Sequence, residues 1–431
     1  MVPAKTVDSQ TGLLVNDMDY WTNWEPIELG AGSTIVRAHE GYRYRVSLYK
    51  GAYDESLVKT YAYDVESNWT TFCAQVPEEG WQTGSYTFEQ PCFARITVQR
   101  IDGFQAVREL RLDEVVDLQV VQPQEPSQPA WAQAEIERVA NRVAELREPG
   151  DLVLVELSGI HYSTGCIWPQ TARNVRAVCK RIKPAAIVQL GDVSDGLTPA
   201  SVMRSFAQRV LGDLDGCGVP VFSCIGNHDV NRFRGNTQQL SKQECSQLYV
   251  GRAIPWYYQD FSHARVRCVF LDSFDPARKQ RYGFSERQVW WLRRVLHKTP
   301  RDWKVLVFSH VPPLAEIHYW SDVIFNGPRM MGILERFDKR RPGSVLGFVH
   351  GHSHVDQVYW KQSFPNVSMG CAKLEDFEER KPEGSFTPAR QLGTASQDLW
   401  NVLVVKPREN RLCWVRFGAG DDDEVITYDP R

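Results

Sequence analysis

Residues 345–354 read VLGFVHGHSH, an apolar run that ends in three histidines at alternate positions. A continuous apolar run of this length is typical of a strand that is covered on both faces. Imidazoles two positions apart at the end of such a strand can converge on a metal ion, and Gly351 permits close backbone approach. By itself the run is a weak signal, because histidines are common in exposed loops. It gains weight because earlier apolar runs end in similar residues: Gly191-Asp192, Gly226-Asn227-His228-Asp229 and Ser309-His310.

The chain from residue 151 to residue 431 alternates short apolar runs with helical stretches. The apolar runs cover residues 152–157, 185–190, 219–225, 266–271, 304–308 and 345–349, and two further strands are expected at 401–405 and 411–417. Helices are expected near 171–183, 199–215, 285–297 and 328–340. This pattern predicts a layered α/β domain whose functional loops lie beyond the carboxyl ends of the strands.

Residues 1–121 consist of short, closely spaced β segments instead. This pattern predicts a small antiparallel β-sandwich. The expected β segments are residues 33–36, 44–49, 57–61, 94–98 and 109–112. Aromatic residues are frequent here, and they serve either as the core of the sandwich or as a flat platform for sugar rings. Residues 122–150 join the two domains through a proline-rich linker at 122–129 and a helix at 131–146.

The composition is that of an ordinary globular protein, with 42% hydrophobic and 24% charged residues among 431. The net charge of -3 comes from 50 basic and 53 acidic residues, which gives no electrostatic case for a nucleic-acid polymer. No apolar stretch reaches the roughly 20 residues of a membrane span. The start lacks the apolar core of a secretion signal, so cytoplasmic and secreted locations both stay open. The β module favours a secreted bacterial protein, and the oligomeric state is not determined.

The ten cysteines include no C-x-x-C pair, which argues against a thiolate zinc site. Most interrupt apolar segments, where a free thiol behaves as a small hydrophobic group. Cys73 and Cys92 could pair, but two buried thiols are the favoured interpretation. The pattern suits a reducing compartment.

Six polar side chains follow the strands of the α/β domain. From His161 to His352, successive members are separated by one βα unit or more, so they can converge at one edge of the sheet. They are His161, Asp192, Asn227, His310, His352 and His354. Nitrogen and hard oxygen ligands without thiolate suit zinc, manganese or iron better than calcium. Two such cations about 4 Å apart would clamp a phosphate and generate a hydroxide nucleophile.

In their order along the chain, these motifs resemble those of the calcineurin-like metallophosphoesterase family: D-x-H, G-D, G-N-H-[DE], a later H, and G-H-x-H. The resemblance covers about residues 151–375 and implies a four-layered α-β-β-α sandwich that hydrolyses phosphate mono- or diesters with two divalent metals. It implies that Asp192 bridges the ions. Asn227, His310 and His352 would complete one site, and His161 and His354 would serve the other. His228 would bind the phosphate or protonate the leaving oxygen, and Asp229 would orient its imidazole by a hydrogen bond.

The first motif departs from the family pattern, because Gly159 stands where the family has its first aspartate. Glu156 is no substitute, since by strand parity it lies on the opposite face, and Ser158 is likewise out of phase. Loss of an anionic ligand should weaken the site of His161 and His354 and leave turnover slow or absent. The glycine belongs either to a natural impaired homologue or to an enzyme inactivated by substitution. The completeness of the other motifs favours the second.

The ester that is cleaved is less clear than the reaction. The residues expected to line the substrate are Tyr162, Arg232, His318 and Tyr319. A phosphodiester is the favoured substrate, and nucleotide-linked and carbohydrate-linked esters are both candidates. The alternative is a glycan-binding or phosphate-binding surface protein that retains the phosphoesterase fold without catalysis.

Overall fold

The computed structural model describes most of the chain, with short gaps. The described residues are 1–7, 14–24, 26–51, 70–78, 80–121, 127–163, 166–232, 236–275, 277–318, 321–374, 383–420 and 424–427. The chain divides into two compact units, of which the second comprises Gln128–Ser163 and Ile167–Arg431. The helix α2 (Ala130–Leu146) lies within this second unit.

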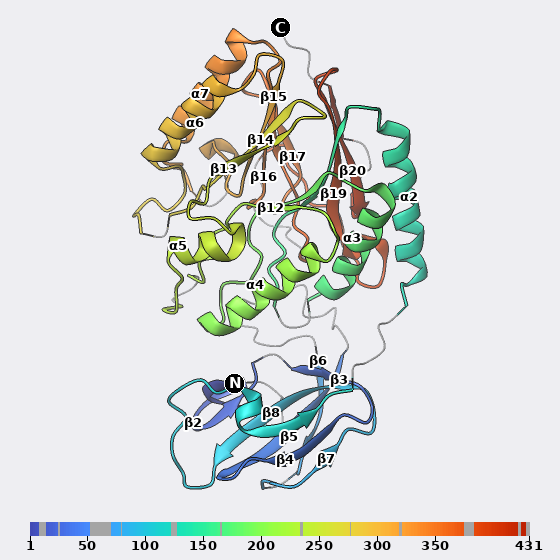
Figure 1. Cartoon of the computed structure of the whole chain (residues 1–431), viewed down its shortest axis with the longest axis vertical. Helices are drawn as coiled ribbons and strands as arrows, with labels where there is room; N and C mark the ends of the chain where they lie inside the picture. Colours follow the sequence, from blue (N-terminus) through green and yellow to red (C-terminus); the bar gives the residue numbers. More distant parts are fainter. Residues whose placement is uncertain are drawn as a thin grey trace. The chain divides into compact units, whose positions relative to one another are not determined.

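Two antiparallel sheets form the first unit within the residues described there (Figure 1). One sheet has the order β1 (Val2–Val7), β2 (Leu14–Thr22), β8 (Cys92–Arg100), β5 (Tyr42–Gly51) and β6 (Thr70–Val76), with β3 (Ile27–Leu29) also paired to β8. The other has the order β7 (Tyr86–Thr87), β4 (Thr34–Ala38) and β9 (Val116–Gln119). One apolar cluster draws side chains from both, including Tyr44 and Ile96 from the first sheet and Ile35 from the second.

Two of the five β segments expected in this unit are not found as strands among the described residues. Residues 109–112 do not form a strand but lead into a 3-10 turn, Leu112–Glu114, which the exposed Asp113 and Glu114 favour over a sheet. The segment 57–61 lies outside the described residues. Among the described aromatic residues of this unit, Trp21, Tyr44 and Phe88 belong to the core. Tyr20 and Trp81 are half-buried and stack at 5.2 Å. All ten cysteines lie in the described part of the chain and none forms a disulfide there, and Cys73 is exposed rather than buried.

The second unit contains two mixed sheets packed face to face. Among the described residues, the first sheet has the order β12 (Val221–Ser223), β11 (Ala186–Gln189), β10 (Leu152–Leu157), β19 (Leu399–Lys406), β20 (Arg411–Gly418) and β21 (Glu424–Thr427). The second has the order β13 (Tyr257–Phe261), β14 (Val266–Leu271), β15 (Lys304–Ser309), β16 (Val345–His350), β18 (Asn366–Ser368) and β17 (Gln357–Tyr359). A core of side chains such as Leu154, Phe270 and Leu403 fills the space between them.

Helices cover the outer faces of both sheets. The helices α2, α3 (Trp168–Ile182) and α4 (Ala200–Asp215) accompany the first sheet, whereas α6 (Glu286–Lys298) and α7 (Gly327–Arg340) pack on the second (Figure 1). Their buried faces recur at helical spacing, as in Val289, Leu292 and Leu296 of α6. The predicted four-layer α-β-β-α architecture is confirmed. No helix in the described part of the chain is long and apolar enough to span a bilayer.

Candidate metal centre

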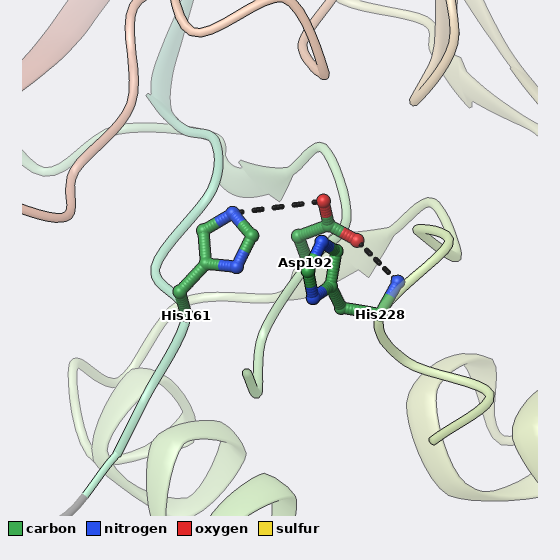
Figure 2. A group of neighbouring side chains, drawn as sticks. All are labelled: His161, Asp192 and His228. Atoms are coloured by element: carbon green, nitrogen blue, oxygen red, sulfur yellow. Dashed lines mark hydrogen bonds and ion pairs between the residues drawn. The ribbon is translucent and has the colours of Figure 1, made fainter. Parts of the chain in front are cut away.

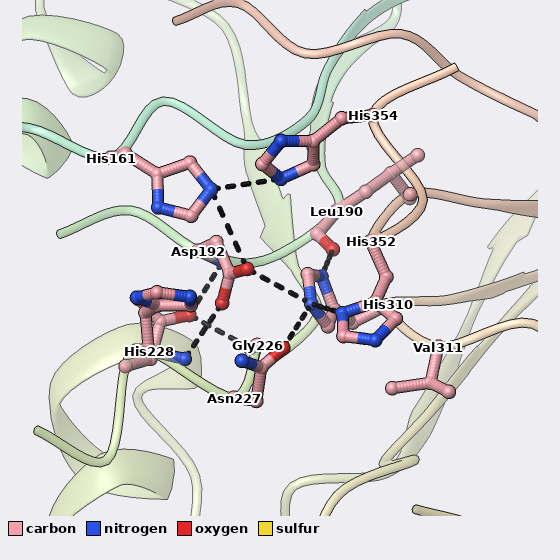
Figure 3. A network of polar contacts seen from close by, with 12 residues as sticks. His161, Leu190, Asp192, Gly226, Asn227, His228, His310, Val311, His352 and His354 are labelled. Carbon is pink, nitrogen blue, oxygen red and sulfur yellow. Dashed lines mark hydrogen bonds and ion pairs between the residues drawn. The ribbon is translucent and has the colours of Figure 1, made fainter. Parts of the chain in front are cut away.

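The parallel strands of the two sheets deliver the predicted ligands to one rim. His161 follows β10, Asp192 follows β11, and His310 follows β15, each just beyond the carboxyl end of its strand. Because the two sheets are packed face to face, loops remote in sequence meet at this rim. Figure 3 shows His161 and His354 on one side of the Asp192 carboxylate, with Asn227, His310 and His352 on the other.

The Asp192 carboxylate lies at the centre of the cluster and contacts residues on both sides. Its Oδ2 lies 3.2 Å from His310 Nε2 and 3.6 Å from His161 Nε2. Its Oδ1 accepts a hydrogen bond from the backbone N–H of His228 at 2.8 Å (Figure 2). Asp192 also belongs to two groups whose ligand atoms all lie within 4.8 Å of one another, one with His161 and His228 and the other with His310 and His352. A carboxylate shared by two groups has the arrangement of a ligand that bridges two cations.

The spacing of the ring nitrogens fits metal coordination. His310 Nε2 lies 3.0 Å from Asn227 Oδ1 and 3.1 Å from His352 Nδ1, and His161 Nε2 lies 3.0 Å from His354 Nε2. Adjacent ligands about 2.1 Å from one cation and at right angles to each other lie about 3.0 Å apart. The His310 Nδ1 also lies 2.7 Å from the Leu190 carbonyl oxygen, which fixes the tautomer that leaves Nε2 as a ligand. The residues present therefore fit divalent metals.

The electrostatics of the cluster favour neutral rings at His161 and His352 and a charged carboxylate at Asp192. Burial, followed by the neighbouring His228, holds the pKa of His161 well below its usual value. Burial likewise lowers the pKa of His352. Burial acts to raise the pKa of Asp192, but the surrounding histidines, His310 first, outweigh it and hold that pKa well below its usual range. Neutral imidazoles and an ionised carboxylate are the forms that bind metals.

The backbone of the cluster is strained. His161, Asp192, His352 and His354 all have positive φ angles, of 45°, 56°, 68° and 55°. Non-glycine residues adopt this left-handed conformation only where the surroundings impose it, and such positions concentrate at functional sites. Gly226 shows how tightly the loops approach, because a β carbon there would lie 2.1 Å from Asp192 Oδ1.

The expected role of Asp229 needs correction. Its carboxylate accepts hydrogen bonds from the backbone N–H groups of Asp192, Val193 and Gly226, at 2.7–2.9 Å, instead of orienting the imidazole of His228. The His228 Nδ1 instead lies 2.5 Å from the carbonyl oxygen of Asp195. Buried backbone N–H groups without hydrogen-bond acceptors would destabilise this loop. The Asp229 carboxylate accepts from them and is therefore not used to orient the His228 imidazole. Asp229 therefore positions the loop that carries Asp192.

Gly159 occupies a place that suits a glycine. Its φ is +56°, and a β carbon there would lie 2.8 Å from the Cys371 β carbon and 3.4 Å from His354 Nε2. The buried Cys371 thus stands where a side chain at position 159 would begin. Glu156 does not replace the missing carboxylate, because it points into the core and accepts a hydrogen bond from Trp414 Nε1 at 2.7 Å. Burial raises the pKa of Glu156 to about 8.

The expected substrate residues separate into different environments. The His318 ring stacks on His352 at 4.9 Å, so His318 does lie beside the candidate ligands. Tyr162 is buried and packs on Phe206 of α4, a packing position that argues against the predicted contact with substrate. Arg232 is half-buried in the loop after His228, and Tyr319 lies outside the described residues.

Sequence reasoning missed three residues of this region. Asp195 positions His228 through its backbone carbonyl, and a backbone role leaves no signal in the residue type. Tyr282 lies with its ring 5.0 Å from that of His352, and Cys371 fills the space beside Gly159. Neither belongs to an ordered motif, so only the folded chain identifies them.

Comparisons with known proteins find phosphoesterases and diphosphatases among the similar proteins. A family model described as calcineurin-like phosphoesterase matches residues 153–356. The matched segment is thus similar to the calcineurin-like phosphoesterase family. Among curated proteins, the chain is similar to manganese-dependent ADP-ribose/CDP-alcohol diphosphatases of Arabidopsis thaliana and Xenopus tropicalis, at 22% identity in both cases. The alignments cover 39% and 40% of this chain and 64% and 65% of those proteins, so the chain spans just under two thirds of their length.

Solved phosphatase structures are also similar to the chain. A dimetal phosphatase from Danio rerio aligns with 65% of this chain and 100% of its own, at 20% identity and a TM-score of 0.45. A purple acid phosphatase from yellow lupin aligns with 97% of this chain and 76% of its own, at 11% identity and a TM-score of 0.45.

Proposed function

We propose that this chain is a metal-dependent phosphoester hydrolase that acts on a phosphate with two substituents. The observation that carries the proposal is the convergence of two groups of candidate ligands on the single carboxylate of Asp192. Divalent cations held by these groups would clamp a phosphate and supply an activated water as the nucleophile.

The other residues of the site have distinct tasks in this proposal. The contact of His228 Nδ1 with the Asp195 carbonyl fixes the ring and leaves Nε2 to bind the phosphate or to give a proton to the leaving oxygen. Asp229 holds the backbone of Asp192 and Val193 in place, so the carboxylate of Asp192 is oriented before substrate arrives. Preorganised groups of this kind lower the barrier because they need no rearrangement during the reaction.

We infer that the group containing His161 and His354 binds its metal less tightly than the group containing His310 and His352. The first group lacks the carboxylate that the family pattern places at position 159, and the contact between position 159 and Cys371 leaves no room for one. An anionic ligand contributes both affinity and acidity to a bound water, so its absence predicts weak occupancy and slow turnover.

The substrate class is proposed from the substitution at phosphorus, which is the same in phosphodiesters and in the substrates that the relatives are named for. The curated relatives are named for ADP-ribose and CDP-alcohols, both diphosphates in which each phosphorus carries two substituents. A phosphodiester has the same substitution at phosphorus. We therefore favour diphosphates and phosphodiesters over monoesters, and manganese over zinc or iron.

The test is hydrolysis of bis(p-nitrophenyl) phosphate and ADP-ribose by the full chain, with and without added Mn²⁺. The proposal expects metal-dependent release of product that is abolished in His310→Ala, whose ring nitrogens contact both Asp192 and Leu190. The matched control is His297→Ala, a histidine in the last turn of α6 that lies outside the site. Absence of turnover in the unaltered chain at any Mn²⁺ concentration would contradict hydrolysis.

A binding protein that retains the fold is the second candidate, and Gly159 is the observation in its favour. On the first unit, the half-buried Tyr20 and Trp81 stack on each other and the Arg45 guanidinium lies 4.8 Å from the Trp81 ring centroid, so a sugar would bind at the edges of this pair. Saturable binding of an oligosaccharide that is lost in Trp81→Ala, in a chain without turnover, would support this alternative.

A further inference from the structure

A basic pocket lies beside the candidate metal centre, beyond the carboxyl end of β14. Its volume is about 290 Å³, and it is lined by residues from the segments 272–275 and 278–287 together with Lys242, Trp256 and Phe325. β14 is the neighbour of β15 in the sheet, and β15 carries His310 at the corresponding end. The pocket and the metal centre thus occupy adjacent positions on the same rim.

Tyr282 connects the pocket to the candidate ligands. Its side chain lines the pocket, and its ring lies 5.0 Å from that of His352 and 4.7 Å from that of His318. Tyr282 is therefore shared by the wall of the pocket and the surroundings of the candidate ligands.

The charges of the pocket leave a net positive surface. The two acidic residues in its wall are already paired, Asp272 with Lys242 at 2.5 Å and Asp275 with Arg278 at 2.9 Å. Arg281 and Arg287 also line it, and neither forms an ion pair or a side-chain hydrogen bond within the described part of the chain. Two uncompensated guanidinium groups at one pocket are suited to the oxygens of a phosphate.

The loop that carries these groups is fixed by backbone hydrogen bonds. The N–H of Gly283 donates to Ser273 O at 2.8 Å, and the N–H of Phe325 donates to Tyr282 O at 2.9 Å. Gly283 has a φ of +132°, and a β carbon there would lie 2.2 Å from Phe325 O, so the close approach requires glycine. A fixed loop reduces the ordering that binding would otherwise require.

We propose that this pocket binds a second phosphate group, carried on the part of the substrate that extends beyond the scissile phosphate. This inference rests on the proposed function for the position of the scissile phosphate. The volume lies at the lower end of the range for small-molecule sites, about 300–1,000 Å³, so the pocket accommodates one phosphorylated group with part of its carrier. The aromatic residues Trp256 and Tyr282 in the same lining favour a carrier with an aromatic base.

The test is calorimetric titration of the full chain with AMP in the presence of a chelator, so that binding does not depend on metal or turnover. The variant Arg281→Gln/Arg287→Gln should bind AMP at least about tenfold more weakly, because two charge-assisted contacts are lost. The matched control, Arg293→Gln/Arg301→Gln, removes the same charge from exposed positions outside the pocket and should stay within about twofold. Adenosine, which has no phosphate, should show no saturable binding.

Equal AMP affinity in the unaltered chain and the Arg281→Gln/Arg287→Gln variant would overturn the inference, as would equal weakening in the control. Lack of AMP binding at millimolar concentration in the unaltered chain would also overturn it. Both arginines are exposed, so the variant is expected to keep its unfolding temperature. Failure of hydrolysis alone would contradict the proposed function and leave this binding result standing.

Discussion

Restoring the missing carboxylate is expected to require two substitutions rather than one. In Gly159→Asp, the new β carbon would meet the Cys371 β carbon at 2.8 Å in a backbone conformation with φ of +56°. The left-handed conformation costs a residue with a side chain about 1 kcal/mol. Forcing an extra carbon into a packed space costs about 1–3 kcal/mol. The single variant should therefore lose about 2–4 kcal/mol of unfolding free energy in its metal-free form.

Cys371→Gly removes the atom that creates the contact. Adding Gly159→Asp to this background should cost only the conformational part, about 1 kcal/mol, so a double-mutant cycle should show a favourable coupling of about 1–3 kcal/mol. The assay is urea unfolding of the four metal-free proteins. The same proteins should differ in metal content, with a second tight equivalent of Mn²⁺ only in the variant that carries both substitutions.

Gly159→Asn/Cys371→Gly is the matched control, because it has the same shape without the charge. If the single Gly159→Asp variant keeps full stability, the packing argument is refuted. If the double variant binds no more Mn²⁺ than the asparagine control, position 159 is not the position of the missing ligand.

Three further outcomes follow from individual side chains. Folding raises the pKa of Glu156 to about 8 from an ordinary value near 4.5, so the unfolding free energy should be highest below about pH 4.5 and should fall as the pH rises toward 8. Glu156→Gln should remove this fall and raise the unfolding free energy by about 3 kcal/mol at pH 7 in urea unfolding. The same pH dependence in the variant and in the unaltered chain would contradict this. His228→Gln should lower the rate about 100-fold or more while the Mn²⁺ stoichiometry stays constant, whereas loss of a metal equivalent would make His228 a ligand. Asp229→Asn should lose about 2–4 kcal/mol in thermal unfolding, because an amide cannot accept from all three backbone N–H groups; full stability would contradict the role assigned to this carboxylate.

The ordered motifs and the apolar runs before them were enough to predict the layered fold, and the structure brings the candidate ligands that they indicate close together. The reason is geometric: parallel strands end at one edge of a sheet, so residues such as Asp192 and His310 that directly follow buried runs are brought together by the topology alone. The same reasoning placed Glu156 away from the metals, because side chains alternate between the two faces of a strand, and its hydrogen bond to Trp414 agrees.

Other features of the site were decided only by the tertiary structure. Asp229 serves the backbone of its neighbours rather than His228, because the unpaired N–H groups of a buried loop compete for the same carboxylate. The contact between Cys371 and position 159, and the pocket behind Tyr282, join segments that no motif connects. Strand periodicity specifies the face of the sheet on which a side chain lies. Loop conformations and side-chain contacts depend instead on how distant segments pack, and no local sequence pattern specifies that packing.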